Sequence, residues 1–341
     1  MPRQFKWAFL LLCIAALLLS SACAKEKLPQ YYENTYEAGT DVLSVSFAYD
    51  TGKVDEDKHP IRHTDEALTE IFSACLTIID EVTPIFDAAD PANALYAVNQ
   101  QVDAVFDCTG TEMELLSRAY RLCDATHGYF QPVIGSLTLA KPEDIEEALT
   151  HTGTEKLTID GTSVYKNDPV AMADISAMRT GYAMEQIVAY LETTDIVYGV
   201  VMLNGNVAVF GEKPEEEAFD IALLADADLD TEEALPEGRL QMREGYLFLT
   251  SDATGGTLDV TTGKAAESDI AKVLVLSDDP VEADVLSDAL YAMGYDAAQT
   301  LYKEGTLRFE AIFFLRNGTV KLTAGAETDA VYTPETTDEK N

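Results

Sequence analysis

Three dipeptides that favour tight hairpin turns, Asp160-Gly161, Asn204-Gly205 and Asn317-Gly318, each lie between two β-like segments. The strands that they would join are residues 156–159 and 164–166, 197–203 and 207–211, and 307–315 and 319–322. Asp-Gly and Asn-Gly accommodate the positive φ angles of short turns between antiparallel strands. Because hairpins outnumber strand–helix–strand crossovers, the sequence predicts an α+β protein with mixed, largely antiparallel sheets and flanking helices.

Helices are expected over residues 64–86, 111–123, 142–150, 181–192 and 281–293, and the apolar spacing is clearest in the first of them. Thr111 and Glu114 are three residues apart, which predicts a capping box at the second helix. Further strands are expected at 42–49, 219–224, 246–250 and 273–276. The end of the chain is rich in Thr and Glu, so a disordered tail is expected over 323–341.

The N-terminus has the layout of a secretory signal peptide. Arg3 and Lys6 precede an apolar run over residues 7–19, which is short for a membrane span, and small residues then lead to Cys23. Residues 1–22 would be the signal peptide, Cys23 the lipidated N-terminus, 23–35 a mobile tether and 36–322 the folded domain. We therefore expect an extracytoplasmic lipoprotein anchored to the cell membrane; an ordinary signal peptide cut near Ala22 is the alternative.

Acidic residues dominate the charge of the chain. The sequence has 60 Asp and Glu against 23 Lys and Arg, for a formal net charge of −37. Such a surface repels nucleic acid, so no nucleic-acid partner is expected. Most of these carboxylates are expected to be solvated, and their number does not indicate a metal site. The sequence has no Cys-x-x-Cys pair that would suggest zinc. One disulfide is possible among Cys75, Cys108 and Cys123, but buried free thiols are favoured, since Cys75 and Cys123 lie in apolar helical segments.

Asp284 and Asp288 lie four residues apart in the helix predicted over 281–293, so both carboxylates lie on one helix face. Like charges at this spacing repel each other unless a cation compensates. Mg²⁺ prefers one or two carboxylates together with phosphate oxygens. The pair is therefore a candidate Mg²⁺ site, and the alternative is that one carboxylate faces solvent.

Residues 174–181, Asp-Ile-Ser-Ala-Met-Arg-Thr-Gly, connect an apolar β-like run to a helix that begins near Gly181. Small residues such as Ser176 and Ala177 would let backbone N–H groups approach a phosphate at the helix start. The alternative is a strand–turn–helix joint whose small residues only permit close packing.

In their order and separation, these segments resemble the FAD:protein FMN transferases of the ApbE family. Residues 174–181 are similar to the family's Asp-Leu-Gly-Gly-Ile-Ala-Lys-Gly, with Thr180 in place of Lys. Asp284 matches the family's Mg²⁺-binding Asp, and Asp288 stands where the family has Thr. The resemblance covers residues 36–303, and it implies that the carbonyl of Ala177 is a further metal ligand.

Three other segments contribute to the resemblance. Residues 127–135 resemble a flavin-lining segment, Thr250 and Ser251 match a Thr-Ser-Gly motif, and residues 257–263 resemble His-Ile-Asp-Pro-x-Thr-Gly with Thr257 in place of His. The cofactor-binding residues that the resemblance implies are Phe130, Pro132, Gly135, Asp174, Ser176, Thr180, Gly181, Thr250, Ser251, Asp259 and Gly263.

The resemblance implies an Mg²⁺-dependent enzyme that moves FMN from FAD onto a Thr or Ser of an exported flavoprotein and releases AMP. Asp284 would be the principal metal ligand, and Asp288 a second ligand or a base. The replacements at Thr180 and Thr257 leave two other possibilities open. One is a flavin-binding lipoprotein without transferase activity, and the other is a scaffold or maturation partner of the same fold.

Overall fold

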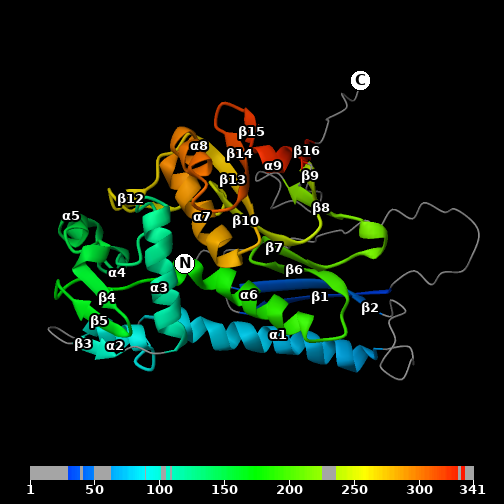
Figure 1. The fold of residues 1–341 in the computed structure, drawn as a ribbon, viewed down its shortest axis with the longest axis horizontal. Coiled ribbons are helices and arrows are strands. Elements are labelled where there is room, and N and C mark those ends of the chain that lie inside the picture. Colours follow the sequence, from blue (N-terminus) through cyan, green and yellow to red (C-terminus); the bar gives the residue numbers. More distant parts are fainter. Residues whose placement is uncertain are drawn as a thin grey trace, which may run out of the picture.

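The computed structural model describes residues 30–38, 41–49, 63–88, 90–100, 105–107, 110–224, 236–328 and 332–334. An eight-stranded sheet forms its centre, in the order β1-β2-β6-β7-β10-β13-β14-β15, and every neighbouring pair is antiparallel (Figure 1). The predicted α+β class is confirmed. The strands of this sheet are β1 (Gln30–Ala38), β2 (Asp41–Tyr49), β6 (Tyr198–Leu203), β7 (Asn206–Gly211), β10 (Gly245–Ser251), β13 (Ile270–Ser277), β14 (Glu310–Leu315) and β15 (Val320–Leu322).

Each face of the sheet is covered by a different layer. Helices α6 (Arg179–Glu192) and α7 (Pro280–Met293) pack on one face, and α1 (Asp65–Phe86) packs against α6. The other face is covered by a three-stranded sheet of β8 (Phe219–Leu224), β9 (Pro236–Met242) and β16 (Tyr332–Pro334). Successive strand residues point to opposite faces. Phe248 of β10 accordingly joins the core on the helix side, and Leu247 joins the core under the small sheet.

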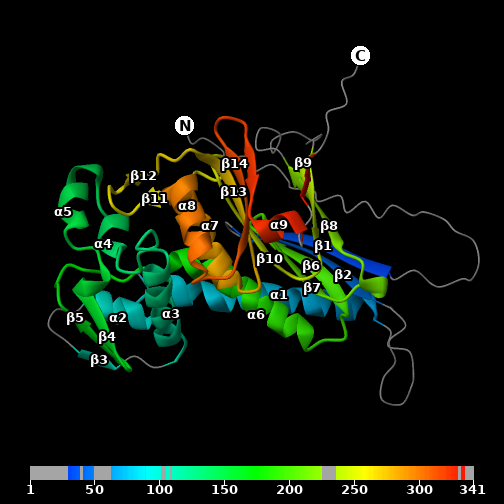
Figure 2. The same cartoon turned by 45° about the horizontal axis from the view of Figure 1, so that its top comes forward.

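A smaller group of elements gathers at one end of the molecule, on the left in Figures 1 and 2. It contains α2 (Ala94–Gln100), α3 (Thr111–Ala125), α4 (Gly135–Thr138), α5 (Ile145–Leu149) and a sheet of β3 (Val105–Asp107), β4 (Leu157–Asp160) and β5 (Ser163–Lys166). The hairpin of β11 (Leu258–Asp259) and β12 (Lys264–Ala265) adjoins α4 and α5. Helix α8 (Tyr295–Glu304) follows α7, and α9 (Ala324–Thr328) follows β15.

The three predicted hairpins are confirmed, with the expected backbone in their turns. Gly161 has φ +62°, Gly205 has φ +85° and Gly318 has φ +82°. Asn204 also adopts a positive φ, of +54°, as a two-residue turn between β6 and β7 requires. These turns place β6 and β7 side by side in the main sheet, and β4 and β5 in the small one.

Three expectations, for the tether, the tail and one helix cap, are wrong. Residues 30–35, expected in a mobile tether, belong to β1, which pairs along its whole length with β2. Residues 324–328 and 332–334, expected in a disordered tail, form α9 and β16. Helix α3 begins at Thr111, but its N-cap is Gly110 and no side chain caps it, so the predicted capping box does not form.

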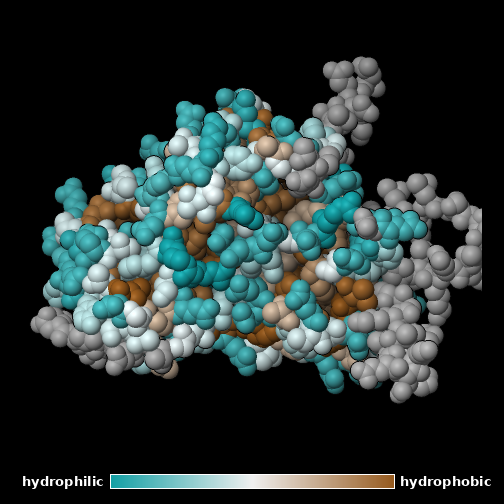
Figure 3. All heavy atoms as spheres, in the orientation of Figure 1, coloured by the Kyte–Doolittle hydropathy of each residue, from teal (hydrophilic) through white to brown (hydrophobic). Residues whose placement is uncertain are grey.

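The surface seen in Figure 3 is largely hydrophilic, with smaller apolar patches between the polar side chains. Cys75 and Cys123 are buried free thiols, as the sequence predicts, and burial raises their pKa values to about 12 and about 11. Within the described residues, no helix is both long enough and apolar enough to cross a membrane. The signal peptide and Cys23 lie outside the described residues.

Candidate active site

Asp284 and Asp288 lie where α7 meets the start of α6 and the end of β10. The Oδ2 atom of Asp284 accepts a hydrogen bond of 2.7 Å from the backbone N–H of Gly181. The hydroxyl of Thr250, in β10, lies 2.8 Å from Oδ1 of Asp288 and 3.0 Å from Oγ of Ser287. Helix α7 therefore holds the two carboxylates between a helix start and a strand end.

Both carboxyl groups resist ionisation more than an ordinary aspartate does. Burial raises the pKa of Asp284 well above its usual value, and the charge of Asp288 adds to that effect, while the Gly181 N–H and the charge of Arg179 oppose it. Burial also raises the pKa of Asp288 to about 6, against the hydrogen bond from Thr250. A bound dication would favour the ionised form of both groups.

The oxygen donors of this site fit Mg²⁺. The ion binds proteins through one or two carboxylates and takes its other ligands from water and substrate phosphates. Asp284 and Asp288 would be the carboxylates, and the Thr250 hydroxyl orients the second. Among the residues that the structure describes, no three His, Cys, Asp or Glu side chains are grouped to hold a metal.

Gly181 lets α6 and α7 approach each other closely. A Cβ at this position would lie 2.4 Å from the carbonyl oxygen of Pro280, so a larger residue requires a backbone shift. The backbone N–H groups of Gly181 and Thr180 both form hydrogen bonds that favour the charged form of Asp284. The helix start predicted to bind phosphate therefore binds a carboxylate of its own chain.

Asp174 joins the segment before α6 to the short helix α4. Its backbone N–H donates to the carbonyl of Pro132 at 2.9 Å. Its Oδ2 accepts from the Thr138 hydroxyl at 2.9 Å, and its Oδ1 accepts from the N–H and the hydroxyl of Ser176 at 3.0 and 2.6 Å. These bonds bring together two segments that the sequence predicts as parts of one site. Ala177 follows in the 3₁₀ turn η3 (Ser176–Met178), which packs against α7.

Gly135 and Phe130 have packing roles in this structure. The N–H of Gly135 donates to the Met172 carbonyl at 2.9 Å, and a Cβ at Gly135 would lie 2.8 Å from Cβ of Met172. Glycine is therefore the residue that allows the two segments to touch. The ring of Phe130 belongs to the main hydrophobic core, and is not turned toward an open surface.

Asp259 organises the turn between β11 and β12. Its Oδ1 accepts from the N–H and the hydroxyl of Thr261 at 2.8 and 2.7 Å, and its Oδ2 accepts from the Thr262 hydroxyl at 2.9 Å. Gly263 follows with φ +67°, and a Cβ there would lie 2.7 Å from the side chain of Ile145 in α5. The turn therefore packs against the smaller group of elements, which contains α4 and α5.

The loop that follows Thr250 is fixed to α7. Ser251 is fully buried, and the next residue, Asp252, pairs with both terminal nitrogens of Arg316 at 2.6 and 2.8 Å. The hydroxyl of Tyr291 donates to Asp252 at 2.5 Å. Since Tyr291 lies in α7, three residues after Asp288, these contacts hold the end of β10 against the helix that carries the carboxylates.

The predicted site residues thus form two groups joined by residues 174–181. The carboxylate group contains Thr180, Gly181, Thr250, Asp284 and Asp288. The turn group contains Pro132, Gly135, Asp174, Ser176, Asp259 and Gly263. Phe130 and Ser251 lie next to these groups but are buried.

Sequence reasoning missed Arg179, the first residue of α6. Its Nη1 and Nη2 atoms each donate to Asp41 at 2.8 Å, and Asn204 donates to the same carboxylate at 2.7 Å. The charge of Arg179 also acts on Asp284. The only signal in the sequence was a basic residue immediately before Thr180, where the family resemblance expects Lys.

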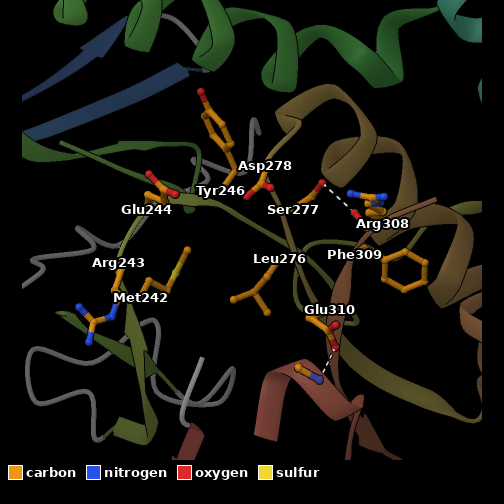
Figure 4. A pocket seen from close by; sticks show the side chains of 11 residues that line it. Met242, Arg243, Glu244, Tyr246, Leu276, Ser277, Asp278, Arg308, Phe309 and Glu310 are labelled. Atoms are coloured by element: carbon orange, nitrogen blue, oxygen red, sulfur yellow. Dashed lines mark hydrogen bonds between the residues drawn. The ribbon is translucent and has the colours of Figure 1, made fainter. Parts of the chain in front are cut away.

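A pocket of about 360 Å³ lies elsewhere, near the start of α7 (Figure 4). It is lined by residues from the turn before β10, the end of β13, the start of β14 and α9. The charged residues among them include Arg243, Glu244, Asp278 and Arg308. Figure 4 shows Ser277 bonded to the backbone of Arg308, and Glu310 bonded to the backbone of Gly325. None of the predicted site residues lines this pocket.

Fold and site together describe an α+β protein with two half-buried carboxylates at a helix junction suited to a hard cation. The chain belongs to the ApbE family, whose sequence profile matches residues 45–313. It is 22% identical over 255 residues to a FAD:protein FMN transferase of Haemophilus influenzae, which covers 67% of this chain and 73% of that protein. It is 22% identical over 302 residues to a FAD:protein FMN transferase of Treponema pallidum, which covers 79% and 82%.

Solved structures support the same fold. The ApbE protein of Thermotoga maritima has a TM-score of 0.71 and 19% identity, and the match covers 88% of this chain and 99% of that one. The flavin transferase ApbE of Vibrio cholerae has a TM-score of 0.69 and 16% identity, with the same coverage. At these identities the likeness concerns the fold.

Proposed function

We propose that this chain is a FAD:protein FMN transferase that depends on Mg²⁺, transfers FMN from FAD to a Thr or Ser of an exported flavoprotein, and releases AMP. The observation that carries the proposal is the pair Asp284 and Asp288 on α7, held against α6 and β10 in a chain of the ApbE family. The names of the relatives support the choice of FAD as the flavin donor and of a protein as the acceptor.

In the proposed reaction, the bond between the FMN phosphorus and the oxygen that bridges it to the AMP phosphate breaks. The acceptor hydroxyl oxygen forms the new bond to that phosphorus, and AMP leaves with the bridging oxygen. Bound Mg²⁺ would neutralise the charge of the pyrophosphate and of the leaving AMP. Asp284 would hold the ion, and Asp288, oriented by Thr250, would be a second ligand or accept the proton of the acceptor hydroxyl.

Replacement of Asp284 tests this proposal. Stabilisation of a transferring phosphoryl group by a metal is worth several kcal/mol. We therefore expect Asp284→Ala to lower AMP release from FAD by about 10²-fold or more, because each 1.4 kcal/mol corresponds to a factor of ten. Glu282→Ala, in the same helix, is the matched control and should retain activity. AMP release is measured by chromatography with Mg²⁺ and an acceptor protein present.

Asp288→Thr restores the residue that the family resemblance expects. It keeps an oxygen ligand and removes a like charge from Asp284, so we expect AMP release to be preserved or increased. A variant that binds metal and loses all transfer would assign Asp288 a catalytic role of its own. A wild-type protein that binds FAD without releasing AMP, when a competent acceptor is present, would instead favour a flavin-binding lipoprotein or a scaffold. Thr180, in place of Lys, and Thr257, in place of His, are the residues that favour those alternatives.

For the location we propose a lipid anchor on Cys23, outside the cytoplasm. The basic start, the apolar run and Cys23 support it. Cys23→Ala should release the protein from the membrane fraction, which immunoblotting of fractionated cells would detect. A wild-type protein found only in the soluble fraction contradicts the anchor.

A further inference from the structure

We propose that Arg179 is a cation that binds the pyrophosphate of FAD, and that it makes the site prefer flavin nucleotides over flavins without phosphate. The inference rests on the proposed function, because it concerns the same substrate. It adds a residue that lies outside the predicted metal pair.

The guanidinium of Arg179 has a fixed orientation. Its Nη1 donates to Oδ2 of Asp41, and its Nη2 donates to Oδ1, both at 2.8 Å. Two parallel bonds of this kind fix the plane of an arginine as well as its distance from the carboxylate. Asp41 is only 8% exposed, so the pair is anchored below the surface at the start of β2.

A third element fixes Asp41 in turn. The side-chain amide of Asn204 donates to Oδ1 of Asp41 at 2.7 Å. The Oδ1 atom of Asn204 accepts from the N–H of Val42 at 2.9 Å, and its own N–H donates to the Val42 carbonyl at 3.0 Å. The turn between β6 and β7 therefore supports the carboxylate that positions Arg179.

Arg179 retains donors for an anion other than Asp41. Arginine has five N–H donors, and the bonds to Asp41 use two of them. The side chain is 24% exposed, so part of it reaches solvent. Arg179 lies two residues before Gly181, which bonds to Asp284, and it interacts electrostatically with that carboxylate. A phosphate bound through a metal at Asp284 would therefore come close to the guanidinium.

Arg179 supplies a positive charge that residues 180 and 181, which follow it in α6, do not. The N–H groups of Thr180 and Gly181 already bond to Asp284, so these two are not available to a phosphate. Residue 180 is Thr and brings no charge. In a chain with a net charge of −37, an anionic substrate requires a local cation, and Arg179 is placed to supply one in addition to the metal.

Binding measurements on the mature chain test the proposal. Dissociation constants for FAD and for riboflavin, which has no phosphate, are obtained from flavin fluorescence in Mg²⁺ and in EDTA. We expect Arg179→Gln to weaken FAD binding by about 10-fold or more under both conditions, since it removes charge-assisted hydrogen bonds, and to change riboflavin binding by less than about 2-fold. Arg179→Lys should fall between the wild type and Arg179→Gln, because it keeps the charge and loses the fork.

Arg118→Gln is the matched control. Arg118 also pairs with carboxylates at the α6–α7 junction, Glu185 and Asp279, but it is not part of the candidate site. Its replacement should lower the melting temperature and leave the ratio of the FAD and riboflavin constants unchanged. If Arg179→Gln does not fold, the test uses Arg179→Lys instead. Weaker binding of FAD together with unchanged binding of riboflavin then supports the proposal.

Equal weakening of FAD and riboflavin binding, or no change in either, would overturn the proposal and leave Arg179 as a structural link between β2 and α6. These outcomes leave the proposed transferase function intact. A wild-type chain that does not bind FAD in the presence of Mg²⁺ would contradict the proposed function itself.

Discussion

Asp288 shows how one residue couples the candidate site to pH. Burial raises its pKa to about 6, which exceeds the usual value of 3.8. The folded protein therefore holds this proton between about pH 4 and pH 6, where the unfolded chain has lost it. The carboxyl group stabilises the fold below pH 4, and that contribution is lost as the pH rises through 6. With a metal bound, stability would instead rise with pH, because the metal requires the ionised form of Asp288.

We therefore predict that Mg²⁺ affinity rises with pH and that at least about tenfold is gained per unit below pH 6, since the proton on Asp288 competes with the ion. Isothermal titration of the mature chain with Mg²⁺ between pH 5 and pH 8 would measure this. Asp288→Thr should flatten the profile over that range, although the raised pKa of Asp284 leaves some dependence. A wild-type affinity that does not vary between pH 5 and pH 7 contradicts the metal role of Asp288.

The contact between α6 and α7 is the element that places the candidate site. Gly181 is the point of closest approach, where an added Cβ would lie 2.4 Å from the Pro280 carbonyl oxygen. The same residue donates its N–H to Asp284. Packing of the two helices and placement of the carboxylate therefore depend on one position.

Gly181→Ala should destabilise the protein by about 1–3 kcal/mol, the usual cost of overpacking a close contact. Urea denaturation would measure the loss. Gly161→Ala is the control, because no atom lies within 4 Å of its added Cβ and only the positive φ of +62° is unfavourable. We expect Gly181→Ala also to weaken Mg²⁺ binding, which Gly161→Ala should not do. Equal stability losses without an effect on Mg²⁺ would contradict the role of this contact.

At the scale of the whole molecule, the net charge of −37 makes the folded chain repel itself. Salt screens such repulsion, and the screening length falls from about 30 Å at 0.01 M to about 10 Å at 0.1 M. We predict that the melting temperature rises by several degrees when NaCl increases from 0.01 to 0.3 M. Scanning fluorimetry would measure it, with KCl as a control that should give the same rise. A melting temperature that falls with salt would show that attractive ion pairs dominate instead.

Local signals were sufficient for much of the fold. Hairpin turns such as Asn204-Gly205 are encoded in neighbouring residues that tolerate positive φ, and the long helix α1 is encoded in its apolar spacing. The strand β1 was not predicted, because its order comes from pairing with β2. Helix α9 was not predicted either, because Glu310 accepts from the N–H groups of Gly325 and Ala326 at its start.

The sequence by itself determined the α+β class and the i, i+4 pair Asp284 and Asp288, because each depends on residues close together in the chain. It also determined the family resemblance, which depends on the order of short motifs along the chain. Only the tertiary structure decided what surrounds that pair. Arg179 meets Asp41 across 138 positions, and Thr250 meets Asp288 across 38. These contacts exist because antiparallel pairing brings β2 next to β6 and because α6 and α7 pack on the same face of the sheet, an arrangement that no local pattern encodes.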